Sequence, residues 1–192
     1  MPRAGLDPAA VTAAAAALTD EIGFDRLSMG LIAERLGVKT PSLYKHVDGL
    51  ADLSHRIAVL AMDEFADTLR DAIQGLAGGD ALAAAAQAIR GFVLEHPGRY
   101  AAANLAQRSG DDDPLVPASG RVLASLAAVL NGYHLEPGQQ IHAMRMLRSV
   151  LHGFATLEAG GGFQIDADVE VSFRWMIDFV DRGLRAIAAE KG

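Results

Sequence analysis

The chain has 192 residues, no cysteine and a formal net charge of −7 at pH 7. The lack of cysteine excludes disulfides and thiolate chemistry. The acidic balance argues against a protein that coats nucleic acid, because non-specific affinity comes from many phosphate contacts. No apolar run reaches the ~18 residues of a membrane-spanning helix, and segment 1–11 lacks a hydrophobic signal region. We therefore expect a cytoplasmic protein with no membrane segment.

Nearly all of the sequence has the composition of α-helix, because alanine and leucine dominate and no stretch alternates with the period of two that a strand requires. The predicted helices cover 8–22, 28–36, 40–47, 48 to at least 69, 81–95, a short segment from 97, about 115–131, 136–159 and 168–189. The predicted fold class is therefore all-α, with about nine helices.

Short polar residues mark the predicted helix starts. Asp7 precedes Pro8, and this pair predicts an N-cap followed by proline at the first helical position, where its missing N–H costs nothing. The further predicted N-caps are Ser28, Thr40 and Asp48, and the predicted helix stops are Gly23 and Gly37. The three aspartates at 111–113 lie in a predicted loop, where a solvated turn is the simplest interpretation.

The two C-terminal helices, 136–159 and 168–189, carry apolar residues on nearly all sides. A surface helix needs only one apolar stripe, so the second face must contact something else. An interface of four helices between two copies of the chain explains it most simply and predicts a homodimer through these helices. The alternative is that other helices of the same subunit bury both faces.

Segments 28–36 and 40–47 have the form of a helix-turn-helix. Ala33 is small where the two helices would cross, Gly37 allows a tight turn, and Val38 packs beneath it. Within residues 26–46, four cations stand against one acid, so positive charge is local although the chain is acidic.

The second helix of this motif displays polar side chains on one face. Leu43 and Val47 are four residues apart and share the inward face. The residues of the outward face are Ser42, Lys45 and His46, with Tyr44 on its flank. A short helix of this kind can enter a DNA major groove. The alternative, an ordinary solvated helical hairpin, does not account for the pattern of residues 26–50 taken together.

The run RLSMGLIAERLGVKTPSLYKHVDGLADL (26–53) resembles the DNA-binding region of the TetR family of bacterial transcriptional repressors. The Ser-capped helix, IAERLGV and SLYKHV carry the resemblance, which covers about residues 8–70. It implies DNA contacts by Thr40, Ser42, Tyr44, Lys45 and His46, a phosphate contact by Ser28 and packing of Pro41 near the groove, and Lys39 is a further candidate. One position departs, because Leu50 stands where the family commonly has a phosphate-binding lysine near the start of helix four. The N-terminus of that helix can still offer backbone N–H groups to a phosphate.

The resemblance implies a three-helix DNA-binding domain over residues 1–48 and a larger helical domain for ligand binding and dimerisation over 49–192. The expected protein is a homodimeric regulator, usually a repressor in this family. Its expected partners are a near-palindromic operator in double-stranded DNA and a small-molecule effector of unknown identity.

The C-terminal half resembles a TetR subfamily marked by a His-Gly pair, here His152-Gly153, although Arg148 replaces the tryptophan often found one turn earlier. Arg145, Arg148 and His152 form a cationic stripe, which would favour an anionic ligand if it faced a cavity. Alternatively, the stripe pairs with Asp178 or Asp181 at the dimer interface, or faces water. The candidate apolar walls of a ligand site, each equally plausible as core, are Phe92, Tyr100, Met144 and Phe154.

No catalytic motif accompanies these features. The sequence contains no phosphate-binding Gly-rich loop, no G-x-S-x-G and no H-x-x-x-H pair. We therefore expect neither an enzyme nor a metal or other cofactor. The rival hypothesis is a small-molecule-binding helical protein or enzyme with a vestigial helix-turn-helix, which the acidic balance and Leu50 support.

Overall fold

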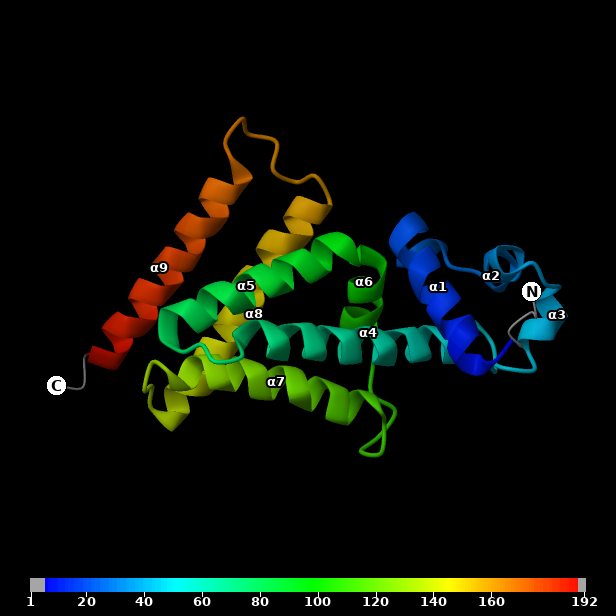
Figure 1. Cartoon of the computed structure of the whole chain (residues 1–192), viewed down its shortest axis with the longest axis horizontal. Coiled ribbons are helices and arrows are strands. Elements are labelled where there is room, and N and C mark those ends of the chain that lie inside the picture. The colour runs from blue at the N-terminus through cyan, green and yellow to red at the C-terminus, as the bar shows by residue number, and fades with distance from the viewer. Residues whose placement is uncertain (1–5, 190–192) are drawn as a thin grey trace. The chain divides into compact units, whose positions relative to one another are not determined.

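The computed structural model describes residues 6–189 and, over that range, consists of helices and loops with no strand (Figure 1). The elements are α1 (Pro8–Ile22), the 3₁₀ turn η1 (Phe24–Arg26), α2 (Met29–Leu36), α3 (Thr40–Leu43), α4 (Leu50–Ile73), α5 (Gly78–Glu95), α6 (Pro97–Leu105), α7 (Leu115–Asn131), α8 (Pro137–Ala159) and α9 (Val169–Ala189). The predicted all-α class is confirmed. None of the helices in the described range is long and apolar enough to cross a membrane. The expectation of no signal region falls partly on residues 1–5, which lie outside the described residues.

The chain forms two compact units, each with its own hydrophobic core. The first contains the described residues up to Glu64 together with Glu95–Ala118, and the second contains Phe65–Leu94 and the residues from Ser119 on. Both α4 and α7 therefore contribute residues to each unit. The functional division into 1–48 and 49–192 stays a prediction.

The first unit packs α1, α2, α3 and the N-terminal part of α4 around a small core. Its fully buried residues include Val11, Ile32, Leu43, Leu53 and Ile57. Helix α6 approaches the end of α1 so closely that a Cβ on Gly98 would overlap the Thr19 carbonyl and lie 2.7 Å from the backbone nitrogen of Asp20. The Asp20 carboxylate fixes this approach by accepting the backbone N–H of Arg99 at 2.9 Å.

The second unit packs α5, α8, α9 and the adjoining parts of α4 and α7 around a larger apolar core. Its fully buried residues include Leu82, Leu130, Leu147, Phe173 and Leu184. Helices α8 and α9 run antiparallel, joined by the loop 160–168, and lie side by side through this core (Figure 1).

Several predicted helix ends are confirmed by their hydrogen bonds. The carboxylate of Asp7 accepts the N–H of Ala10 at 2.7 Å, and Gly23 donates its N–H to the last turn of α1. The start of α5 differs, because the helix begins at Gly78, three residues before the predicted Ala81. Gly78 has a positive φ of 56° and no Cβ, so the helix can begin within the glycine pair of the loop.

The interpretation of 111–113 as a solvated turn is wrong for its last residue. Asp111 and Asp112 are exposed, but Asp113 is buried. The Asp113 carboxylate accepts the N–H and the hydroxyl of Ser109 at 2.7 and 2.8 Å and the N–H of Leu115 at 2.8 Å. A carboxylate that accepts this many hydrogen bonds can be buried. Composition alone does not reveal these bonds.

The two C-terminal helices differ in their outward faces. On α8 the apolar residues Met144, Met146, Val150 and Phe154 pack against the core of the second unit, so packing within the chain accounts for most of the predicted second apolar face. Ile141 and Leu157 stay exposed. The outward side chains of α8 include Arg145 and Arg148. Helix α9, in contrast, keeps large apolar side chains on its exposed side.

Candidate DNA-binding and effector sites

The helix-turn-helix consists of α2, a three-residue turn and α3. Ser28 begins it as predicted, because its Oγ accepts the N–H of Leu31 at 3.3 Å. Gly37 ends α2 in the left-handed region, with φ 65°, and donates its N–H to Glu34 at 3.0 Å. The N–H of Val38 then donates a hydrogen bond to the carbonyl of Ala33 at 3.0 Å. These two hydrogen bonds form the glycine C-cap that sets the angle between the two helices.

The predicted cap of α3 is wrong. Lys39 occupies the N-cap position without a side-chain hydrogen bond, and Thr40 is the first helical residue. The α-helix ends at Leu43 rather than Val47, and turns follow it. Because Val47 N–H still bonds to the Leu43 carbonyl at 3.1 Å, helical spacing continues through the segment.

The two faces of this segment lie as the sequence predicted. Leu43 and Val47 are buried in the core of the first unit. Tyr44 is 56% exposed. The other candidate DNA contacts divide into exposed Lys39, Pro41 and Lys45 and half-buried Ser28, Thr40, Ser42 and His46.

Charge on this face is smaller than the sequence count indicated. Arg35 forms a two-bond ion pair with Glu21, at 2.6 and 2.5 Å, so one of the four local cations is neutralised. Lys39 and Lys45 form no ion pair or hydrogen bond through their ammonium groups within the described residues. These two lysines therefore supply the free positive charge of α3 and its flanks.

Helix α4 starts differently from its prediction. Asp48 is not the N-cap, because the helix begins at Leu50 and the N–H of Leu53 bonds to Gly49 at 3.0 Å. An N-cap side chain would accept an N–H from the first turn, whereas here Asp48 donates its own backbone N–H to the carboxylate of Asp52 at 2.9 Å. Burial raises the pKa of Asp52, but the Asp48 N–H and the Arg56 guanidinium, also at 2.9 Å, outweigh it and hold the pKa below its usual range. Asp52 thus places a negative charge in the first turn of α4.

The six candidate ligand residues fall into different environments. Phe92 is buried, with its ring centroid 5.1 Å from that of Phe65. Met144, His152 and Phe154 are half-buried on α8, and Arg148 is exposed. Tyr100 is half-buried on α6, in the first unit. The structure therefore brings Met144, Phe154 and the core of the second unit together, and the ligand roles stay predictions.

A buried ion cluster in the second unit was missed by sequence reasoning. Arg90 of α5, whose side chain is 11% exposed, donates two hydrogen bonds to Glu158 of α8, at 2.6 and 2.7 Å, and a third to Glu170 of α9. Its guanidinium carbon lies 4.6 Å from the ring centroid of Phe173. The bond to Glu158 raises the pKa of Arg90, with burial opposing, and the bond to Arg90 lowers that of Glu170. One side chain thus connects three helices.

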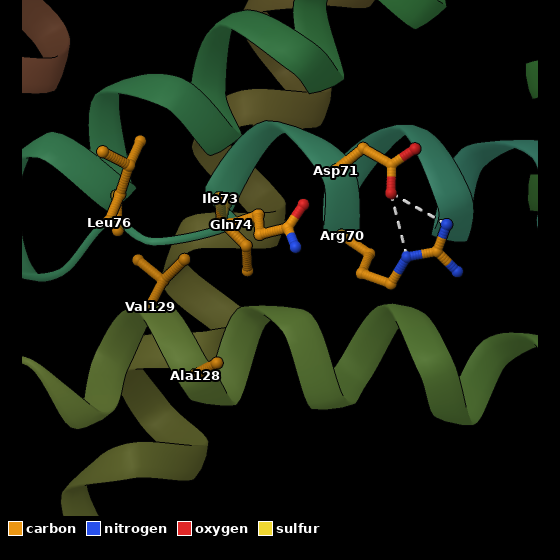
Figure 2. A pocket seen from close by; sticks show the side chains of 8 residues that line it. Arg70, Asp71, Ile73, Gln74, Leu76, Ala128 and Val129 are labelled. Carbon is orange, nitrogen blue, oxygen red and sulfur yellow. Dashed lines mark hydrogen bonds and ion pairs between the residues drawn. The ribbon is translucent and has the colours of Figure 1, made fainter.

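The second unit also contains a pocket of about 400 Å³ between the end of α4, the start of α5 and α7 (Figure 2). The apolar wall of the pocket is formed by Ile73, Leu76 and Val129, and Gln74 lies among them. Arg70 and Asp71 stand at one side and bind each other at 2.8 Å. None of the six candidate ligand residues lines this pocket, although its volume is in the range of small-molecule sites.

Comparison with known proteins identifies the family. Residues 11–53 match the model described as bacterial regulatory proteins, tetR family, and residues 82–180 match Tetracyclin repressor-like, C-terminal domain. The chain is 36% identical over 158 residues to the uncharacterised HTH-type transcriptional regulator Rv0681 of Mycobacterium tuberculosis, covering 82% of this chain and 72% of the relative. It is 33% identical over 178 residues to the uncharacterised HTH-type transcriptional regulator YobS of Bacillus subtilis, covering 92% and 91%. This chain belongs to the TetR family.

Solved structures share the TetR fold with this chain. A protein of unknown function from Rhodococcus sp. RHA1 has a TM-score of 0.80 at 22% identity, covering 96% of this chain and 99% of that one. A single-residue variant of TetR from Acinetobacter baumannii AYE, in complex with minocycline, has a TM-score of 0.71 at 20% identity, covering 96% and 99%. BioQ with its double-stranded DNA operator has a TM-score of 0.66 at 21% identity, covering 95% and 99%.

Membership of the TetR family makes the chain a DNA-binding transcriptional regulator, as the sequence predicted. The His-Gly subfamily stays a prediction. Among residues 6–189, no three histidine or acidic side chains gather in a way that could hold a metal ion.

Proposed function

We propose that two copies of this TetR-family chain bind a near-palindromic operator, each placing the segment 40–47 in a major groove. The two grooves would lie about 34–36 Å apart, one helical turn of DNA. The observation that carries the proposal is the arrangement of this segment. Leu43 and Val47 are buried beneath the exposed Tyr44 and beneath Lys45, whose ammonium group has no partner among residues 6–189. A motif that no longer bound DNA would not need exposed tyrosine and lysine side chains on this face.

The polar residues would divide between backbone and bases. Lys45, Tyr44 and Thr40 position the protein on phosphates, while Ser42 and His46 reach base edges. The hydroxyl of Ser28 accepts the Leu31 N–H and keeps its own proton free to donate to a phosphate. Lys39 adds an exposed cation at the start of α3, and Pro41 lies next to it on the exposed side.

A small molecule in the second unit would regulate this binding, and the output would be repression. The complex of TetR with minocycline and that of BioQ with its operator support the two halves of this proposal by analogy. The ligand must prefer the conformation that does not bind DNA, because only differential affinity shifts an equilibrium. Phe92, Met144, His152 and Phe154 are the candidate contacts in the second unit, with Tyr100 and Arg148 as further candidates.

The decisive experiment measures binding of the purified chain to DNA that flanks its own gene, at two salt concentrations. We expect a palindromic footprint with two chains per site. Lys45→Ala should weaken binding to all sequences and flatten the slope of log K against log salt by ~0.9 per subunit, hence by nearly 2 per dimer. The control is Arg108→Ala, which removes an exposed charge outside the helix-turn-helix.

Weak binding that is indifferent to sequence would contradict the proposal and favour a ligand-binding protein with a vestigial motif. An unchanged salt slope in Lys45→Ala would remove Lys45 from the phosphate contacts while leaving the operator proposal intact.

A further inference from the structure

The outward side of α9 carries a stripe of large apolar side chains. Val171, Trp175 and Phe179 follow one another at spacings of four residues and are 53%, 63% and 62% exposed. The rings of Trp175 and Phe179 stack, with centroids 5.6 Å apart. Asp178 lies on the same stripe and is exposed. We call Val171, Trp175, Asp178 and Phe179 the α9 stripe.

The outward side of α8 has a different chemistry. Ile141, Arg145 and Arg148 recur at spacings of four and three, and all are exposed. We call these three residues the α8 stripe. No ion pair or hydrogen bond from either guanidinium occurs within the described residues. Among residues 6–189, these two cations therefore have no acid partner.

The acids of α8 and α9 show which partner could satisfy those cations. The acids already bound within the chain are Glu158 and Glu170, which bind Arg90, and Asp181, which accepts from Tyr133 at 2.6 Å and from Arg185 at 2.8 Å. Asp178 differs, because its carboxylate has no partner among residues 6–189 and only its carbonyl accepts a bond, from Arg182. The sequence left Asp178 and Asp181 as equal candidates, and the structure leaves only Asp178 available.

The positions of the two charges along their helices fit an interface with two-fold symmetry. Arg148 has eleven residues of α8 on either side, and Asp178 has nine residues of α9 before it and eleven after it. In an isologous interface the same patch of each copy faces the other, and residues near the middle of the patch meet near the axis. A central cation and a central acid can therefore form the same pair twice.

In the homodimer through the last two helices that the sequence predicts, we infer that Arg148 of each copy pairs with Asp178 of the other. This rests on the homodimer of the proposed function and adds its contacts. The apolar side chains of the α9 stripe supply the buried area, and the two reciprocal ion pairs fix the register. This role for Arg148 competes with its predicted role in ligand binding, because a side chain paired across the interface cannot serve an effector.

Charge reversal tests the pairing. In Arg148→Glu the introduced glutamate faces Asp178 of the other copy, and in Asp178→Arg the introduced arginine faces Arg148. Each variant alone should dimerise about a hundredfold more weakly than the natural chain, because like charges are placed together twice. When the two variants are mixed, each heterodimer contains two opposite-charge pairs, so dimers should return. Sedimentation velocity over a range of chain concentrations measures both effects.

Arg108→Glu and Asp112→Arg are matched controls that make the same changes in net charge on the exposed loop before α7. Each should dimerise like the natural chain, alone and mixed. If the natural chain is monomeric at every concentration, the homodimer and this inference both fail. If the natural chain is a dimer but the reversals leave it intact, or the mixture stays monomeric while both variants keep natural helicity, only the Arg148–Asp178 pairing is overturned.

Discussion

The imidazole Nε2 of His55 lies 3.0 Å from Oδ1 of Asp113, and this contact joins α4 to the loop before α7 within the first unit. The side chain of Asp113 has no exposed surface. The N–H groups of Ser109 and Leu115 hold the pKa of Asp113 well below its usual range, burial opposes them, and the Ser109 hydroxyl and His55 add to the decrease. The carboxylate therefore organises the loop through four donors.

Asp113→Asn should lower the urea midpoint at pH 7, because the new amide group places N–H donors against donors. A carboxylate whose pKa is depressed in the folded state stabilises the fold above its ordinary pKa and loses that effect as pH falls below it. The gap between the natural chain and the variant should therefore shrink below about pH 4. Urea unfolding at pH 7 and pH 3 measures it. Asp112→Asn, at an exposed neighbour, is the control. If the difference in urea midpoint between the natural chain and Asp113→Asn were the same at pH 7 and pH 3, the Asp113 carboxylate would not be the source of the stability.

Arg90→Met should destabilise the second unit strongly, because Glu158 loses both of its hydrogen bonds inside a largely buried site. Removing one partner of a buried pair costs ~3 kcal/mol or more. Arg90→Lys should cost less, since it keeps the charge, but one ammonium cannot reproduce the two-bond contact with Glu158. Urea unfolding at fixed chain concentration compares them. Equal stability of the two variants would mean that charge alone, without the guanidinium geometry, holds the cluster.

The sequence predicted those features whose causes lie within a few residues. The cap at Asp7 and the turn at Gly37 follow from bonds that span three or four residues, and both are present. The burial of Leu43 beneath an exposed Tyr44 follows from helical spacing in the same way. The N-caps predicted at Thr40 and Asp48 were wrong, because short polar residues before a helix offer several neighbouring cap positions. The spacing of the sequence does not choose among these positions.

Contacts between distant segments could not be predicted. The bond from Arg90 to Glu158 spans 68 residues and that from His55 to Asp113 spans 58, so no local pattern marks either. The even distribution of apolar residues on α8 also concealed which of them the core would bury. Among the candidate site residues, the sequence could name the outward side of α3, but it could not show that Glu21 neutralises Arg35.

Gly98→Ala should separate α6 from α1, because the new Cβ would overlap backbone atoms of Thr19 that cannot rotate away. Overpacking against backbone should cost ~2 kcal/mol or more of unfolding free energy. Gly91→Ala in α5 is the control. Nothing lies within 4 Å of a Cβ there, so helix propensity should stabilise that variant by ~0.5–1 kcal/mol. If both variants gained stability, α6 would not be fixed against α1.

Leu50→Lys should strengthen DNA binding. Leu50 is exposed at the first position of α4, where the carboxylate of Asp52 lies in the same turn and opposes an approaching phosphate. A lysine here would add one phosphate contact per subunit and steepen the salt dependence by ~0.9 per subunit. Affinity for any DNA should rise at low salt, with little change in preference between operators, because phosphate contacts carry no sequence information. Leu105→Lys makes the same change in charge at an exposed leucine of α6 and should leave the slope unaltered. If both variants steepened the slope equally, the gain would come from net charge, and the start of α4 would not lie against the DNA backbone.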